Sequence, residues 1–366
     1  MMAKFNTKAV HVGQKPDKET GAVISPIYQT TTYQQSAPGE HKGFDYTRAD
    51  NPNFRNLEAV LAALEEAKYA TVFSSGLGAA LAVLNLLEAG DHVVAGNDLY
   101  GGSYRLFKKW GERFGLSFTF VDSTNANAFQ KAVSQKTKLI WMESPTNPLL
   151  RLSDIAAISK MAKAKKILTV VDNTFASPYF QKPLNLGADL VLHSTTKYIG
   201  GHSDVIGGVV ATNREDLQEM LHFRRMALGV NPSPFDCWLT QRGVKTLGIR
   251  MEQHQKNAKA VAAFLKKHPL CKKVYYPGFG GMVSAEFKLS NAETKKLISR
   301  FELFTLAESL GGVESLVCHP ATMTHASIPA EERAKSGLTD GLVRFSVGIE
   351  DSEDLIDDLE KALSQL

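Results

Sequence analysis

The sequence predicts an α/β fold in two domains. Between residues 69 and 211, short apolar runs rich in β-branched residues alternate with helical patterns, as in a mostly parallel sheet covered on both faces. After Gly243 a long helical pattern is followed by sparser strand-like runs, which indicates a smaller α+β domain. A chain of 366 residues is long enough to bury a hydrophobic core in each domain.

Seven strands are expected in the large domain, each a run of apolar residues that ends at a polar or turn-forming residue. They lie at residues 70–73, 92–95, 117–121, 138–142, 167–171, 189–193 and 205–211. Helices with apolar residues three or four positions apart are expected between many of these strands, among them 76–87, 153–164 and 214–228.

The smaller domain is expected to contain a long helix at 250–267, strands at 283–289, 304–307 and 342–347, and a closing acidic helix at 352–366. Residues 1–47 hold turn formers such as Pro26, Pro38 and Gly39 and show little helical period. We therefore expect an extended arm that packs on a neighbouring subunit. The predicted organisation is an arm at 1–47, a large domain at 48–247 and a C-terminal domain at 248–366.

Composition excludes several classes of protein. The net charge of +4 is spread along the chain without the basic stripe of a nucleic-acid binder. Cys237, Cys271 and Cys318 are odd in number and far apart, which indicates reduced thiols rather than disulfides or a metal site. No apolar run approaches the ~20 residues of a membrane span, and residues 1–10 lack the apolar core of a signal peptide. We expect a cytoplasmic protein with no membrane or nucleic-acid partner.

The segment from Val191 to His202 carries the strongest chemical signal. It places Lys197 directly after an apolar run, with Ser194 and Thr196 beside it. An amine at a strand end suits Schiff-base formation with a carbonyl cofactor, and the hydroxyl groups suit a phosphate. Pyridoxal phosphate meets both requirements. A solvated loop lysine is the alternative reading of this segment alone.

A second segment, residues 73–79, joins a strand to a helix through glycines. The backbone N–H groups of Gly76 and Leu77 can then point at a phosphate at the positive end of the helix. Glycines between a strand and a helix also occur for purely geometric reasons. This segment therefore supports a phosphate site only together with the other segments.

Three further side chains follow or interrupt strands. Asp172 ends an apolar strand, where a pyridinium nitrogen would offset its burial, although a helix cap is the ordinary alternative. Tyr100 follows another strand and could stack on a cofactor ring or be an ordinary half-exposed tyrosine. Arg344 lies within an apolar strand and calls for an anion, either a substrate carboxylate or an internal ion pair.

Together these pieces resemble the Cys/Met-metabolism family of fold-type I pyridoxal-phosphate enzymes, which includes the cystathionine γ-lyases and γ-synthases. The matching segments run in order along nearly the whole chain, at residues 45–48, 75–77, 98–102, 143–148, 171–174, 194–197, 307–315 and 344–348.

The resemblance implies the fold-type I transferase fold, pyridoxal 5'-phosphate as cofactor, and Lys197 and Tyr100 as catalytic residues. The implied cofactor-binding residues are Tyr46, Arg48, Gly76, Leu77, Tyr100, Asp172, Ser194, Thr196 and Lys197, of which Tyr46 and Arg48 come from a neighbouring subunit. The implied substrate-binding residues are Asn147, Ser309, Arg344, Arg105 and Glu308. A homotetramer built of two catalytic dimers, and no metal, are also implied.

The chain departs from the family pattern in three places. The usual Asn-Pro-Thr-Arg reads Asn51-Pro-Asn-Phe54, with Arg55 displaced by one position. The polar pair before the middle helix is Arg225-Met226. The segment 276–281 lacks a connecting stretch of roughly a dozen or more residues, long for an ordinary loop, that relatives carry there. Either this stretch is deleted in the protein, or a disordered segment is missing from the sequence.

The expected reaction is γ-elimination on L-cystathionine, which gives cysteine, 2-oxobutanoate and ammonia. The alternative is γ-synthase activity, in which cysteine displaces the acyl group of an O-acyl-homoserine. Gly102 stands where methionine γ-lyases carry cysteine, which disfavours that activity. Of two other classes, a dinucleotide-binding oxidoreductase is disfavoured because the glycine fingerprint is missing, and a catalytically silent pyridoxal-phosphate-binding regulator because Lys197, Tyr100 and Arg344 are all present.

Overall fold

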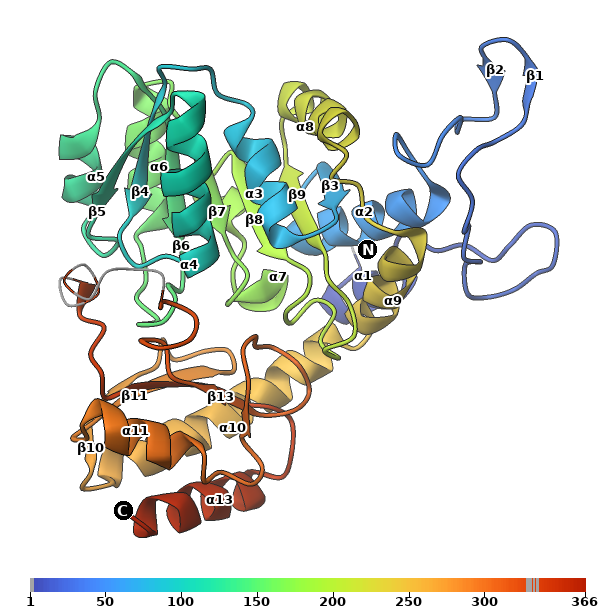
Figure 1. Ribbon diagram of the computed structural model, residues 1–366. Helices are drawn as coiled ribbons and strands as arrows, with labels where there is room; N and C mark the ends of the chain where they lie inside the picture. Colours follow the sequence, from blue (N-terminus) through green and yellow to red (C-terminus); the bar gives the residue numbers. More distant parts are fainter. Residues whose placement is uncertain (1–2, 327–330, 332, 334–335) are drawn as a thin grey trace.

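The computed structural model describes residues 3–326, 331, 333 and 336–366 and confirms the predicted α/β architecture. Figure 1 shows a large domain stacked on a smaller one, with the long helix α10 running between them. The large domain is built on a seven-stranded sheet in the order β3-β9-β8-β7-β6-β4-β5, in which only β9 runs against its neighbours. The strands are β3 (Tyr69–Phe73), β4 (His92–Gly96), β5 (Ser117–Val121), β6 (Thr137–Glu143), β7 (Leu168–Asp172), β8 (Leu190–Ser194) and β9 (Gly208–Thr212).

Both faces of this sheet are buried, as its continuous apolar strands predict. Leu139 and Trp141 of β6 pack on one face with residues of α3 and α8, whereas Ile140 and Met142 pack on the other with residues of α5 and α6. The helices of the domain are α2 (Pro52–Glu65), α3 (Gly76–Leu84), α4 (Gly101–Arg105), η1 (Leu106–Gly111), η2 (Glu112–Phe114), α5 (Ala126–Ala132), α6 (Ile155–Ala164), α7 (Ser177–Phe180), η3 (Pro183–Leu186), α8 (Glu215–Leu228) and α9 (Pro234–Val244).

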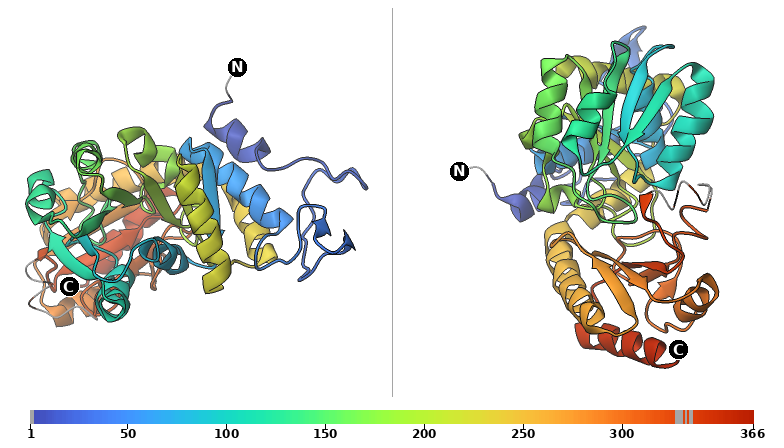
Figure 2. Two further views of the ribbon diagram at one scale, coloured as in Figure 1. Left: turned by 90° about the horizontal axis from the view of Figure 1, so that it is seen from above. Right: turned by 90° about the vertical axis from the view of Figure 1, so that its left-hand side faces the viewer.

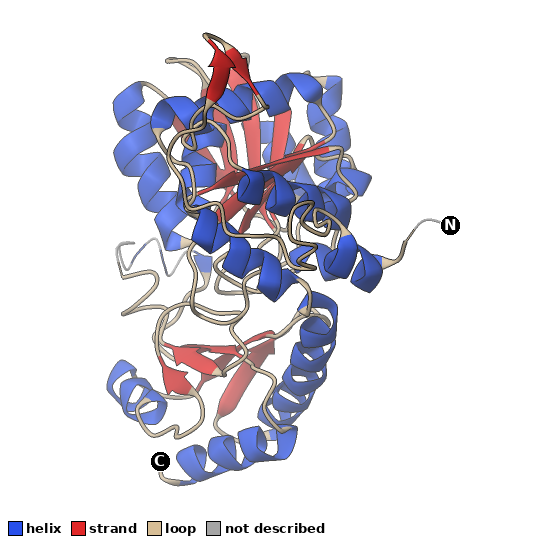
Figure 3. Cartoon of the chain, turned by 90° about the vertical axis from the view of Figure 1, so that its right-hand side faces the viewer, coloured by secondary structure: helices blue, strands red, loops and turns tan. Residues whose placement is uncertain are grey.

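The smaller domain packs helices on one side of a five-stranded sheet in the order β10-β11-β14-β13-β12, as Figure 3 shows from the side. All of its strand pairs are antiparallel except β12 with β13. Its elements are α10 (Leu247–Lys267), β10 (Cys271–Tyr275), β11 (Met282–Phe287), α11 (Asn291–Ile298), β12 (Thr305–Leu306), β13 (Leu316–Cys318), β14 (Leu342–Ser346) and α13 (Ser352–Ser364).

The arm differs from the prediction at its start. A short helix, α1 (Phe5–His11), occupies part of the segment expected to be extended, and it packs against α2 and α10. Its Ala9 and Phe5 join the apolar cluster beneath those helices, which explains why a helix forms there. Farther along, β1 (Gln35–Ala37) and β2 (Glu40–His41) form an exposed hairpin that projects from the large domain (Figures 1 and 2).

Several predicted boundaries shift by a few residues, and β10 and β13 were not expected. The strand expected at 205–211 begins only at Gly208, because the preceding residues form a loop in which the Gly207 N–H donates to the Thr196 hydroxyl. The short connection at 276–281 closes an antiparallel hairpin in which Tyr275 pairs with Ser284. The domain limits at residues 47 and 247 stay a prediction. No helix in the described ranges has the length and apolar character needed to cross a membrane.

Asp358 is a buried anchor of the smaller domain. Its carboxylate accepts hydrogen bonds from the backbone N–H groups of Glu302, Leu303 and Phe304, at 2.8 to 3.0 Å. We expect Asp358→Ala to lower the free energy of unfolding of this domain by about 2 kcal/mol, because these donors lose a charged acceptor. Urea titration followed by circular dichroism measures the change. The neighbouring Asp357 is exposed, so Asp357→Ala is the matched control and an equal loss in both variants would contradict the assignment.

Candidate active site

The candidate site lies at one edge of the large sheet, where the parallel strands end. Because β6, β7 and β8 run in the same direction, the residues that follow them meet at this edge. A cavity of about 380 Å³ opens there against the smaller domain. Most of the residues singled out from the sequence line it, namely Gly76, Leu77, Tyr100, Asn147, Asp172, Ser194, Thr196, Lys197, Glu308, Ser309 and Arg344.

The amino end of α3 forms one wall of the cavity. Ser75 caps the helix, since its Oγ accepts the N–H of Gly78 at 2.9 Å, and this leaves the earlier N–H groups free to point outward. Gly76 has no space for a side chain, because a Cβ there would lie 2.8 Å from the Cβ of Ser194. The backbone can therefore approach an anion closely beside the Ser194 and Thr196 side chains.

Lys197 lies in the cavity just beyond the end of β8. Its Nζ donates to the Ser309 hydroxyl at 2.7 Å. Burial, with a smaller contribution from the positive charge of Arg344, lowers the pKa of Lys197 to about 8. A much larger share of this amine is neutral near neutral pH than of an ordinary lysine, so it is suited to act as a nucleophile and as a base.

Two carboxylates lie side by side at the sheet edge and line the same cavity as Lys197. Asp172 ends β7 directly opposite Glu143 of β6, and burial raises the pKa of both groups. The charge of Asp172 raises the pKa of Glu143 further. Asp172 accepts hydrogen bonds from the Thr174 hydroxyl at 2.5 Å and from the Thr174 N–H at 3.1 Å, which fix its orientation. A cation at this position would relieve the cost of keeping Asp172 ionised.

Arg344 enters the cavity from β14 of the smaller domain and is 2% exposed. Its Nη1 donates to Asn147 Oδ1 and its Nη2 to the backbone carbonyl of Ser309, both at 2.9 Å. Neither partner is a carboxylate, so the guanidinium retains its charge for an anion in the cavity. Ser309 has a φ of 87°, a left-handed conformation that is costly for serine and is typical of functional sites.

Tyr100 stands at the mouth of the cavity and is 40% exposed. Its backbone N–H donates to Glu143 Oε2 at 3.0 Å. The ring packs on Gly102, where an added Cβ would lie 2.3 Å from the Tyr100 Cε1 atom. Glycine at 102 therefore permits the present position of the ring, which a larger residue would displace.

Three predicted site residues do not line this cavity: Tyr46, Arg48 and Arg105. Arg48 instead donates from Nη1 to the Met226 carbonyl at 3.0 Å and lies over the Tyr46 ring. Arg105 is exposed at the end of α4. Their assigned contacts with cofactor or substrate stay predictions.

The structure also adds lining residues that the sequence analysis did not select. Glu143 and Ser75 fall within motifs already quoted, and a carboxylate or hydroxyl directly after an apolar strand is the signal that would have found them. Thr324 comes from a loop of the smaller domain, between β13 and β14. No local pattern marks that loop as facing the cavity.

The cavity matches the chemistry of pyridoxal phosphate group by group. A low-pKa amine at Lys197 faces it, a carboxylate at Asp172 can meet a ring nitrogen, and helix N–H groups with hydroxyls can hold a phosphate. Arg344 remains for a carboxylate of the substrate. On these grounds the fold and site define a fold-type I pyridoxal-phosphate enzyme.

Comparison with known proteins leads to the same class. The model of the Cys/Met metabolism PLP-dependent enzyme family matches residues 6–364. A cystathionine beta-lyase of Coxiella burnetii is 52% identical, over 98% of this chain and 97% of that protein. A cystathionine gamma-lyase of Dictyostelium discoideum is 48% identical, over 99% of this chain and 98% of that protein. The crystal structure of metB from Corynebacterium glutamicum superposes with a TM-score of 0.97 at 46% identity, covering 100% of this chain and 98% of that one.

The chain therefore belongs to the Cys/Met metabolism family of pyridoxal-phosphate-dependent enzymes. The expectations about family, fold class and cofactor are confirmed.

The pKa of Lys197 predicts how the apoprotein reacts with added pyridoxal phosphate. Only the neutral amine attacks an aldehyde, so the rate should rise about tenfold per pH unit up to pH 8 and then level off. Stopped-flow absorbance between about pH 6 and pH 10 measures it. The same reaction with N-acetyl-lysine amide corrects for titration of the cofactor itself. A corrected rate that keeps rising to about pH 10 would contradict the lowered pKa.

Proposed function

We propose that this enzyme cleaves L-cystathionine at the Cγ–S bond to give cysteine, 2-oxobutanoate and ammonia. The main support is that Lys197, Arg344 and Glu308 line one cavity. Relatives named cystathionine gamma-lyase, such as the one from Bacillus subtilis at 47% identity, support the same reaction.

Bound pyridoxal phosphate would supply the electron sink that makes the Cα proton of the substrate acidic. Lys197 Nζ removes that proton, because burial lowers the pKa of the amine and so increases the share of it that is neutral. The same Nζ can return a proton to the leaving sulfur. The Ser309 hydroxyl accepts a hydrogen bond from Nζ and so holds the amine within the cavity. Asp172, whose orientation is fixed by its hydrogen bonds with Thr174, is the residue that would hold the ring nitrogen.

The substrate α-carboxylate binds Arg344 in this proposal. Asn147 and the Ser309 carbonyl hold the guanidinium by two hydrogen bonds, so its planar donors are fixed before the substrate arrives. Tyr100, which also lines the cavity, is the residue that would stack on the cofactor ring.

Glu308 favours a substrate with a charged distal end. Its carboxylate lines the cavity and acts on the pKa of Lys197, which places its negative charge near the reacting amine. Cystathionine carries a second ammonium group that such a carboxylate can attract. The same feature serves a γ-synthase, whose product is cystathionine, and this reaction is the second candidate. A solved cystathionine gamma synthase of Xanthomonas oryzae pv. oryzae superposes with a TM-score of 0.97 at 43% identity, over 100% of this chain and 99% of that one.

We further propose that two chains complete each site and that two such dimers form a tetramer in the cytoplasm. Tyr46 and Arg48 are the residues expected to reach the phosphate of the neighbouring chain, and neither lines the cavity of its own chain, which is consistent with this role. The unpaired state of all three cysteines supports a reducing compartment.

The identity of the keto acid tests which bond of cystathionine breaks. We expect purified holoenzyme with L-cystathionine alone to release 2-oxobutanoate and cysteine, whereas cleavage on the other side of sulfur would give pyruvate and homocysteine. Chromatography of the products separates the two. A second assay supplies O-succinyl- or O-acetylhomoserine with cysteine. Pyruvate as the main product would favour β-cleavage. A rate of cystathionine formation in the second assay that exceeds the rate of its cleavage in the first would favour the synthase.

Arg344→Ala should raise KM for cystathionine by about 100-fold, because a buried charged contact with the substrate is lost. The effect should fall mainly on KM, since the carboxylate is held in both ground and transition states. Steady-state kinetics measures it, and an unchanged cofactor spectrum shows that the site is intact. An unchanged KM would mean that Arg344 is structural.

A further inference from the structure

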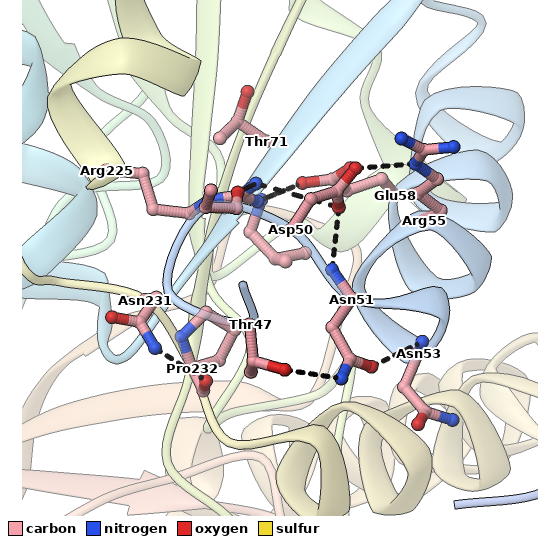
Figure 4. Close-up of polar contacts among 12 residues, drawn as sticks. Thr47, Asp50, Asn51, Asn53, Arg55, Glu58, Thr71, Arg225, Asn231 and Pro232 are labelled. Atoms are coloured by element: carbon pink, nitrogen blue, oxygen red, sulfur yellow. Dashed lines mark hydrogen bonds and ion pairs between the residues drawn. The ribbon is translucent and has the colours of Figure 1, made fainter. Parts of the chain in front are cut away.

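Arg225, near the end of α8, is among the largest fully buried side chains of the chain and is 0% exposed. Its Nη1 lies 2.5 Å from Glu58 Oε1 of α2, and its Nη2 donates to the Ala49 carbonyl at 2.8 Å. A buried cation without its carboxylate partner is strongly destabilising, so these contacts fix the side chain firmly. Figure 4 shows Arg225 pointing at Glu58 and Asp50, with Arg55 contacting Asp50 from the opposite side.

Two departures from the family pattern meet at this point. Phe54 stands where the pattern has arginine, and the Arg225 guanidinium lies over its ring at 5.3 Å from the centroid. Glu58 lies one helical turn after Phe54 on the same helix. The displaced Arg55 instead bonds Asp50 at 2.6 Å. In this chain the positive charge beside Glu58 therefore comes from α8 and not from α2.

The carbonyl that Arg225 holds belongs to a tight turn at residues 46–50. The N–H groups of Ala49 and Asp50 both donate to the Tyr46 carbonyl, at 3.0 and 3.1 Å. Arg48, within the turn, donates to the carbonyl of Met226, the residue after Arg225. The turn that carries Tyr46 and Arg48 is thus attached to the end of α8 by two arginine contacts.

We propose that Arg225 is a positioning residue that holds the turn 46–50 so that Tyr46 and Arg48 are presented to the phosphate of a neighbouring chain. This inference rests on the two-chain site proposed above. Arg225 acts through the arm of its own chain on the site of the other chain. It therefore has a signature that a purely structural residue lacks, because its loss can be complemented in trans.

The test uses Arg225→Gln, which removes the charge and cannot reach both Glu58 and the Ala49 carbonyl. We expect the purified variant to bind pyridoxal phosphate about 10- to 100-fold more weakly, the range typical of residues that orient a ligand-binding group from behind. It is then co-expressed with Lys197→Ala, each chain carrying its own tag. One site of a mixed dimer takes Lys197 from the first chain and an intact arm from the second. About one quarter of wild-type activity should return, since half of randomly formed dimers are mixed and each has one intact site.

Two control variants make the result decisive. Arg224→Gln removes the neighbouring arginine, which donates a hydrogen bond to the Asn85 carbonyl, away from the arm. This variant should bind the cofactor as tightly as the wild type does. Tyr46→Phe with Lys197→Ala tests the two-chain site itself. Recovery with Tyr46→Phe but not with Arg225→Gln would overturn the role of Arg225 and leave the two-chain site standing. Recovery with neither would overturn both proposals.

Wild-type cofactor affinity in Arg225→Gln would also overturn the inference. If that variant is insoluble, Glu58→Gln takes its place, because it loosens the same guanidinium while keeping an acceptor for the Val72 N–H. It should show the same weaker cofactor binding and the same recovery with Lys197→Ala. The role of Arg225 would again be overturned if co-expression of Glu58→Gln with Lys197→Ala restores no activity while co-expression of Tyr46→Phe with Lys197→Ala does.

Discussion

The active site depends on the parallel register of β6, β7 and β8. This register sets Glu143 directly opposite Asp172 and Asp172 opposite Leu192, so that the residues after β8 follow immediately beside the two carboxylates. Like charges at neighbouring positions in a buried sheet edge repel, and burial raises the cost of each. The resulting arrangement is unfavourable without a cation, and a protonated ring nitrogen of the cofactor would be one such cation.

The smaller domain contributes a positive charge to the same cavity, through Arg344. The positive charge of Arg344 on β14 adds to burial in lowering the pKa of Lys197, which follows β8. Their geometry is set by contacts across the domain boundary. Ser284 of β11 donates to the Pro148 carbonyl at 2.7 Å, and Arg250 of α10 donates to the Tyr198 carbonyl, next to Lys197, at 2.7 Å. A small rotation of one domain would therefore change the position of Arg344 relative to Lys197 in the cavity.

In this chain an ion pair joins α8 to α2, because Arg225 contacts Glu58. The Glu58 carboxylate on α2 accepts hydrogen bonds from the Val72 N–H of β3 and from the Arg225 guanidinium of α8. Whether that guanidinium comes from α2 or from α8 changes what else it can hold. From α8 it also reaches the Ala49 carbonyl, and so links the arm to the large domain.

The α/β class, most strands of the large sheet and the residues that follow them could be predicted from the residue pattern alone. Strands buried on both faces are continuously apolar, and Lys197, Asp172 and Tyr100 each come at or shortly after the end of such a run. The helical form of α1, the position of Thr324 at the cavity and the contact of Phe54 with Arg225 are seen only in the folded chain. These features depend on contacts between segments far apart in the chain, such as α2 with α8, and local residue patterns carry no information about which distant segment will lie opposite.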